Sequence, residues 1–229
     1  MKKLYIVANW KANKTNLEAK EWLQEISNFN PPAGGQISND QEKEVVVCPP
    51  FTLLSLMHDF VKQNDLSLYL GAQDVSPFGM GAYTGEVAAE QLKELAQYVI
   101  VGHSERRKNF HEDDEIIAKK VERAMTVGLE PILCVQGADT PIPNGVHVVA
   151  YEPVFAIGTG TPDTPENANA VAKEIKNKHK DASLLYGGSV TSENVASFTH
   201  QEHIDGVLVG GASLNASEFM KIVQNASKI

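Results

Sequence analysis

Residues able to move a proton or to bind an anion occur at widely separated points of this chain. Asn9 and Lys11 supply an amide and a cation, His103 an imidazole and Glu152 a carboxylate. Such a set can transfer a proton at the carbon next to a carbonyl group. The carboxylate removes the proton, while the imidazole and the ammonium group stabilise the negative charge that develops on the carbonyl oxygen. Each of these residues follows a short apolar run, so the surrounding elements decide whether the four meet.

Two glycine pairs, Gly187-Gly188 and Gly210-Gly211, follow apolar runs in the same way. Glycine lets backbone N–H groups approach an anion closely, and such groups at the start of a helix bind phosphate. Either pair alone could be a tight turn, and together they indicate a phosphate site. The loop Gly158-Thr159-Gly160, which follows Glu152, can act as a lid.

His103 and Glu152 also have simpler interpretations. His103 could be an ordinary histidine at the end of a strand, and Glu152 could form a structural ion pair with Lys11 or with an arginine. The predicted lid after Glu152 favours the chemical interpretation of both residues.

Short apolar runs rich in β-branched residues alternate with helical patterns along the chain. Runs without polar alternation are typical of strands buried on both faces, and their alternation with helices indicates a parallel α/β sheet. Eight such units predict a closed (β/α)8 barrel, for which about 200–250 residues suffice, so residues 1–229 are expected to form a single domain. The predicted strands are 4–9, 43–48, 66–73, 98–103, 131–135, 146–151, 182–186 and 204–209.

Helix signals lie between these strands. Helices are predicted over 15–29 behind Thr15, over 112–127 before Gly128, from Thr164-Pro165 onward, and over 215–226. Active sites of such barrels lie at the carboxyl ends of the strands. The proton-moving residues and the glycine loops should therefore share one rim.

The connection after strand 131–135 is unusually short. Only 136–145 remain before the next strand, and they contain Pro141, Pro143 and Gly145. A parallel crossover normally needs a dozen or more residues, so the helix after this strand is predicted to be missing or reduced to a loop. Its loss should bare apolar barrel surface, which either the 136–145 segment folds back to cover or a second interface covers.

Composition excludes several classes of protein. Of 229 residues 42% are hydrophobic and the formal charge is -9, while no basic cluster exceeds Arg106-Arg107-Lys108, so no nucleic-acid partner is expected. Two cysteines, Cys48 and Cys134, suit a reducing compartment. Because neither a membrane helix nor a signal peptide is recognisable, we expect a cytoplasmic protein without membrane contact.

Neither a cofactor nor a metal is expected. Gly79, Gly81 and Gly85 have the wrong spacing for a dinucleotide fingerprint. His200 and His203 lie at helical spacing without a third ligand nearby and are interpreted as surface residues.

As a set, the segments around these residues resemble the motifs of the triosephosphate isomerase family, in family order from Ala8 to about Leu214. They are Asn9-Trp10-Lys11, Gly102-His103-Ser104-Glu105-Arg106-Arg107, Tyr151-Glu152-Pro153-Val154, Ala156-Ile157-Gly158-Thr159-Gly160, Tyr186-Gly187-Gly188-Ser189 and Val209-Gly210-Gly211-Ala212-Ser213.

This resemblance implies a TIM barrel that interconverts dihydroxyacetone phosphate and D-glyceraldehyde 3-phosphate in glycolysis and gluconeogenesis through an enediolate. It implies that Glu152 is the base, His103 the neutral electrophile and Lys11 the cation, with Asn9 as a supporting donor and Glu105 as the partner of the lysine. The pairing of a glutamate base with a neutral histidine is a known feature of this enzyme family. The implied phosphate ligands are the backbone N–H groups of Gly158, Ser189, Gly210 and Gly211.

The resemblance also implies two contacts of the resting or assembled protein. Ser104 is similar to the residue that holds the glutamate at rest. The loop 73–86 is similar to one that inserts into a neighbouring subunit, which implies a homodimer with Thr84 directed toward the partner, and a higher oligomer would be compatible with the bared surface.

The sequence departs from the family after Val135, at Phe155 where tryptophan is usual, and at Pro162. Since proline fixes φ, we expect a somewhat stiffer lid. Two alternative functions stay open: a catalytically weakened barrel that acts as a binding or scaffold protein, and an isomerase for another phosphosugar.

Overall fold

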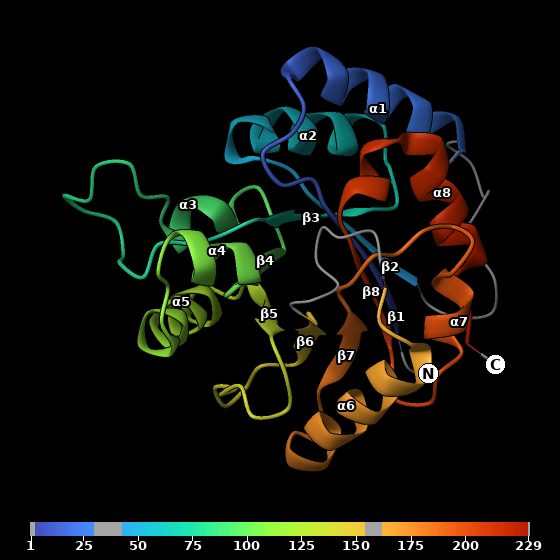
Figure 1. Cartoon of the computed structure of the whole chain (residues 1–229). Coiled ribbons are helices and arrows are strands. Elements are labelled where there is room, and N and C mark those ends of the chain that lie inside the picture. Colours follow the sequence, from blue (N-terminus) through green and yellow to red (C-terminus); the bar gives the residue numbers. More distant parts are fainter. Residues whose placement is uncertain (1–2, 30–42, 154–161, 229) are drawn as a thin grey trace.

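Eight parallel strands close into a barrel in the computed structural model, which describes residues 3–29, 43–153 and 162–228 (Figure 1). Each strand pairs with the next in sequence, and β8 pairs with β1, placing Tyr5 opposite Gly206. The predicted (β/α)8 barrel is confirmed. The strands are β1 (Leu4–Asn9), β2 (Lys43–Cys48), β3 (Tyr69–Ala72), β4 (Tyr98–Val101), β5 (Glu130–Val135), β6 (Val148–Tyr151), β7 (Ser183–Tyr186) and β8 (Gly206–Val209).

Several strands are shorter than the apolar runs that predicted them. Leu66, Val146 and Ile204 precede β3, β6 and β8, and all three are buried without belonging to the paired segments. Apolar character reports burial, whereas a strand also needs backbone pairing with its neighbours. The sequence therefore located each strand but overestimated the length of these three.

Two helices begin directly after the capping residues that the sequence predicted, whereas the helix predicted over 112–127 begins at Asp114. Thr15 and Glu18 hydrogen-bond reciprocally at the start of α1 (Asn16–Phe29). Thr164 accepts the backbone N–H of Asn167 at the start of α6 (Pro165–Lys178), with Pro165 in the first turn. The other helices are α2 (Phe51–Gln63), α3 (Ala89–Lys93), α4 (Ser104–Asn109), α5 (Asp114–Thr126), α7 (Val195–Thr199), the 3₁₀ helix η2 (Gly211–Leu214) and α8 (Ala216–Asn225).

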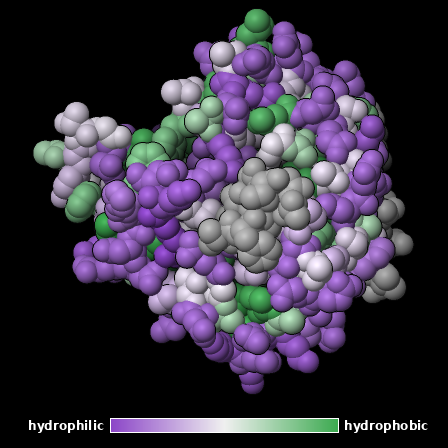
Figure 2. Space-filling view, in the orientation of Figure 1, coloured by the Kyte–Doolittle hydropathy of each residue, from purple (hydrophilic) through white to green (hydrophobic). Residues whose placement is uncertain are grey.

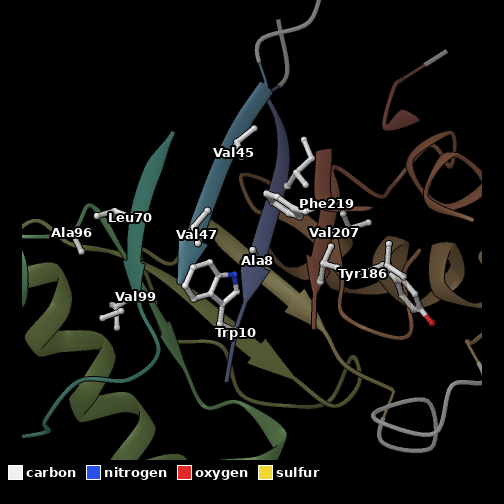
Figure 3. Packing of buried hydrophobic residues seen from close by; sticks show 14 of the residues in the cluster. Ala8, Trp10, Val45, Val47, Leu70, Ala96, Val99, Tyr186, Val207 and Phe219 are labelled. Carbon is white, nitrogen blue, oxygen red and sulfur yellow. The ribbon is translucent and has the colours of Figure 1, made fainter. Parts of the chain in front are cut away.

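Alternate residues of the strands build two separate apolar layers. Tyr5, Val7 and Cys48 belong to a cluster inside the barrel. Their neighbours along the chain belong to a larger cluster between the barrel and the helices, where Figure 3 shows Val47 of β2 and other outward side chains. Burial on both faces explains why the strands read as continuous apolar runs.

No helix occurs between β5 and β6, and the structure describes every residue of that connection. The outward side chains of Leu133, Val135 and Val149 are nevertheless fully buried. Ala138 and Ile142 of the connection pack against the same core cluster. The missing helix is confirmed, and of the two ways to cover the barrel wall the structure shows the first, in which the 136–145 segment folds back.

The loop 73–86 projects from the barrel beside α3 (Figure 1), and Figure 2 shows hydrophobic residues at its tip. At its base, Asp74 forms an ion pair of 2.7 Å with Lys120 of α5, and Lys120 also contacts Glu112 at 2.6 Å. Burial raises the pKa of the Asp74 carboxyl although the Lys120 ammonium group opposes that rise. The loop is therefore anchored at its base by a buried charged cluster.

Candidate active site

Glu152 lies directly after β6 with its carboxylate almost fully buried. Its Oε1 is 2.9 Å from Nε2 of His103, and its Oε2 accepts the backbone N–H of Ser104 at 2.9 Å. The implied resting contact with Ser104 is thus made by the main chain, because among the described residues the hydroxyl of Ser104 has no hydrogen-bond partner. The thiol of Cys134 lies close by, and its pKa is raised by burial and by the Glu152 carboxylate.

His103 lies between β4 and α4, and a hydrogen bond from the main chain determines which ring nitrogen acts as the acceptor. Its Nδ1 accepts the backbone N–H of Glu105 at 3.2 Å, as the N-cap of α4. In the neutral ring one nitrogen accepts and the other carries the proton. The proton is therefore assigned to Nε2, which donates to Glu152.

Lys11 follows β1 with φ at 54°, in the left-handed region. Its backbone N–H donates to Oδ1 of Asn9 at 3.0 Å, and its ammonium group contacts Oε1 of Glu105 at 2.5 Å. The sequence left open an ion pair between Glu152 and Lys11. In the structure Lys11 pairs with Glu105 instead. The side-chain oxygen of Asn9 accepts the main-chain hydrogen bond from Lys11. The NH₂ group is therefore the part of the Asn9 amide that can donate to a substrate.

The glycines after β7 pack too closely for any side chain. A Cβ atom on Gly187 would lie 2.9 Å from Cγ of Glu152, and one on Gly188 would lie 2.1 Å from the hydroxyl oxygen of Tyr186. The hydroxyl group of Tyr186 also accepts the backbone N–H of Asp163 at 2.8 Å. The 187–189 loop therefore lies directly against the catalytic candidate Glu152, which a tight turn alone would not require.

A cavity of about 260 Å³ unites most of the predicted residues at the carboxyl ends of the strands. Glu105 is not among its lining residues and reaches it only through Lys11 and His103. Gly158, Phe155 and the rest of 154–161 lie outside the described residues. The lining residues are Asn9, Lys11, His103, Glu152, Gly187, Gly188, Ser189, Val190, Thr191, Leu208, Gly210, Gly211 and Ala212.

Sequence reasoning missed Gln73, which follows β3 and donates from Nε2 to the carbonyl oxygens of Lys11 and Cys48. The rule that selects polar residues at strand ends would have found it had it been applied to β3.

Within residues 3–29, 43–153 and 162–228, no three His, Cys, Asp or Glu side chains come together in a way that could hold a metal ion. Over the same ranges no helix is long and apolar enough to cross a membrane. His200 is exposed and contacts the hydroxyl of Ser227 at 3.1 Å.

The closed barrel and the residues gathered at its carboxyl rim define a (β/α)8 barrel enzyme of the acid–base class. A sequence model of the family described as triosephosphate isomerase matches residues 4–145 and 142–226. The two matched segments meet in the short connection between β5 and β6.

Proteins with the same description resemble the chain over nearly its whole length. The triosephosphate isomerase of Mycoplasmopsis pulmonis is 39% identical, covering 97% of this chain and 98% of its own. That of Thermus thermophilus is 36% identical, covering 99% and 100%. The crystal structure of triosephosphate isomerase from Bartonella henselae superposes with a TM-score of 0.82 at 31% identity, covering 97% and 98%. The chain belongs to the triosephosphate isomerase family.

Proposed function

We propose that the chain interconverts dihydroxyacetone phosphate and D-glyceraldehyde 3-phosphate, as an enzyme of glycolysis and gluconeogenesis. The observation that carries the proposal is the 2.9 Å contact of the buried Glu152 carboxylate with Nε2 of His103, both in the cavity that Lys11 also lines. A base, a neutral donor and a cation are what an enediolate intermediate requires.

Glu152 is the base that moves a proton between two adjacent carbons of the substrate. In the described arrangement its carboxylate is held by His103 and by the N–H of Ser104. It must leave at least the Ser104 contact to reach a substrate carbon, so this is the resting position. The carboxylate is already desolvated there, which strengthens its interaction with a substrate proton.

His103 is the electrophile that stabilises the negative charge developing on the substrate oxygens. Its Nε2–H is free to donate to an enediolate oxygen once Glu152 withdraws, because Nδ1 stays bound to the Glu105 N–H. A neutral donor suits this role, since the proton can be given to one oxygen and recovered from the other.

Lys11 offsets the charge of the phosphate and of the oxyanion, and Asn9 adds a donor. Glu105 holds the lysine ammonium group at rest. The backbone N–H groups of Ser189, Gly210 and Gly211 bind the phosphate, and Gly158 completes this set by resemblance. The net charge of -9 opposes long-range attraction of a dianion, so binding depends on these local groups.

We further propose that the whole chain is one domain and that it acts as a cytoplasmic homodimer. Strands from both ends of the chain complete one barrel, which supports a single domain.

The loop 73–86 supports the homodimer. Its large apolar side chains are exposed, with Met80 at 70%, and Phe78 stacks on Tyr83 at 4.3 Å. Such a patch on a projecting loop suits burial in a second copy, with Thr84 reaching the partner's site. Light scattering of wild type and Met80→Asp tests it; a wild-type monomer rejects the dimer.

A coupled isomerase assay in both directions tests the proposed activity. Wild type should convert either triose phosphate without added metal or cofactor. Glu152→Asp should be much slower because its carboxylate is one methylene farther from the substrate carbon. No conversion by a folded wild type would reject the activity and favour a binding or scaffold role, while faster conversion of a longer phosphosugar would favour another substrate.

A further inference from the structure

One side chain bridges two main-chain groups of the loop that follows β7. Nδ2 of Asn194 donates to the carbonyl oxygen of Ser189 at 3.0 Å, and Oδ1 of Asn194 accepts the backbone N–H of Thr191 at 2.8 Å. An asparagine amide offers a donor and an acceptor, so this single side chain holds a carbonyl group and an N–H group that lie two residues apart.

The segment 189–191 that Asn194 holds is part of the candidate active site. Among the described residues that line the cavity are Ser189, Val190 and Thr191, but not Asn194. The two hydrogen bonds fix two consecutive peptide groups, 189–190 and 190–191. Because each peptide group is planar, they also restrict the backbone rotation of Ser189, whose N–H group is proposed to bind the phosphate.

Both flanks of the segment 189–191 are anchored independently of Asn194. Before it, the N–H of Gly187 donates to the carbonyl oxygen of Tyr151 at 2.8 Å. After it, the N–H and the hydroxyl of Ser192 donate to the carboxylate of Glu218 in α8 at 2.8 Å and 3.1 Å. The loss of Asn194 should therefore change the path of these three residues and leave the barrel intact.

The position of Asn194 before α7 does not explain its contacts. An asparagine directly before a helix usually caps it through a side-chain hydrogen bond to the first turn. Among the described residues, Asn194 makes no such bond to α7. Its amide is turned back toward the loop that follows β7, so the loop and not the helix accounts for the orientation of this side chain.

We propose that Asn194 is a positioning residue for phosphate binding, whose amide fixes the segment 189–191 so that the N–H of Ser189 meets the substrate phosphate. The inference rests on the proposed function. Glu152 is held by His103 and Ser104, from another part of the rim. Asn194 should therefore affect the binding of the phosphate group and not the proton transfer itself.

Two substitutions remove the bridge in different ways. Asn194→Leu loses both hydrogen bonds at a similar side-chain size. Asn194→Asp keeps an acceptor for Thr191 but turns a second oxygen toward the carbonyl oxygen of Ser189. We expect either change to lower kcat/KM for dihydroxyacetone phosphate about 10- to 10²-fold, since a misplaced binding group costs up to this much. KM and the inhibition constant of inorganic phosphate should both rise.

A substrate without phosphate separates phosphate positioning from a general structural effect. D-glyceraldehyde offers the same carbons to Glu152 but makes no phosphate contact, so it lacks the binding energy that the phosphate supplies. Its slow isomerisation, followed by NMR, should proceed in Asn194→Leu with the kcat/KM of wild type. A general distortion of the site would lower kcat/KM for both substrates alike.

Asn177→Leu is the matched control, because it makes the same change at an exposed position of α6 for which the described residues provide no side-chain hydrogen bond. It should keep all wild-type constants. Circular dichroism confirms that each variant is folded before its kinetics are compared.

Two results would overturn the inference. One is an equal loss of kcat/KM for the substrates with and without phosphate in Asn194→Leu. The other is wild-type kcat/KM and wild-type phosphate inhibition in folded Asn194→Leu and Asn194→Asp. A folded wild type without activity on triose phosphates would instead reject the proposed function itself.

Discussion

Two neighbouring connections of the barrel differ in what they must supply. The connection from β5 to β6 has no helix, and it covers the barrel wall with Ala138 and Ile142. The connection from β6 to β7 begins with Glu152 and contains α6. Both help to bury outward apolar side chains, but only the second contributes to the cavity. The difference teaches that covering a barrel wall can be done by a few apolar side chains, whereas the chemistry requires particular groups at fixed positions.

The largest expected effect separates the two connections by activity. Glu152→Gln keeps the size of the side chain but removes the base, so kcat should fall by about 10²–10⁴-fold. Asp139→Asn makes the same change in the other connection, at an exposed residue that pairs with Lys178, and should leave kcat unchanged. Steady-state kinetics of both variants check this; comparable losses would contradict the division of labour.

The next effect concerns stability in the connection that retains its helix. Ile175 of α6 is fully buried against the core. Ile175→Ala should lower the free energy of unfolding by about 2–5 kcal/mol, because the deletion leaves a cavity. Urea denaturation measures the loss, and kcat of the folded fraction should stay near that of wild type.

A smaller loss is expected in the helix-free connection. Ile142 is only partly buried, although it packs against the same cluster, so Ile142→Ala should cost about 1 kcal/mol. Urea denaturation alongside Ile175→Ala gives the comparison. A cost as large as that of Ile175→Ala would mean that this loop supports the barrel as strongly as a helix does.

The smallest effect is a pH dependence at the amino end of β5. Burial raises the pKa of the Glu130 carboxyl, and the nearby His147 opposes this rise. The folded protein binds this proton more tightly than the unfolded chain, so its contribution to stability is present at low pH and is lost as the pH rises through the folded pKa. Glu130→Gln should therefore raise the thermal midpoint at pH 7.

The advantage of Glu130→Gln should disappear below about pH 4, where the carboxyl is protonated in both states. Thermal unfolding of wild type and variant across this range supplies the measurement. An advantage that persists at low pH would assign the effect to packing rather than to ionisation.

Much of this fold could be predicted because each strand is buried on both faces, and continuous runs such as Val45-Val46-Val47 leave few alternatives. The helix-free connection was predictable because only residues 136–145 separate the two predicted strands, too few for a crossover helix. The sequence did not decide whether the 136–145 segment or a second interface covers the barrel wall. Ile142 reaches the core because of the path that the loop takes in space, which the sequence does not specify.

The site was predictable as a set of residues but not as a set of contacts. Strand-end positions and family motifs pointed to Lys11, His103 and Glu152. Two contacts could not be predicted: the pairing of Lys11 with Glu105 and the hydrogen bond from the main chain of Ser104 to Glu152. Both depend on the path of the backbone in the loops that follow the strands. Gln73 was missed because the rule for polar residues at strand ends was not applied to β3, although its carbonyl partners on Lys11 and Cys48 could not be identified from the sequence.

Isomerisation in deuterated water tests the central claim, that Glu152 moves a proton through an enediolate, most directly. A carboxylate that carries the proton exchanges it with solvent, so product formed from dihydroxyacetone phosphate should contain deuterium at C2, and Glu152→Gln should form neither labelled nor unlabelled product at a comparable rate. Mass spectrometry or NMR of the trapped product gives the answer. Rapid formation of product without any deuterium, or labelling that survives in Glu152→Gln at the wild-type rate, would contradict the account.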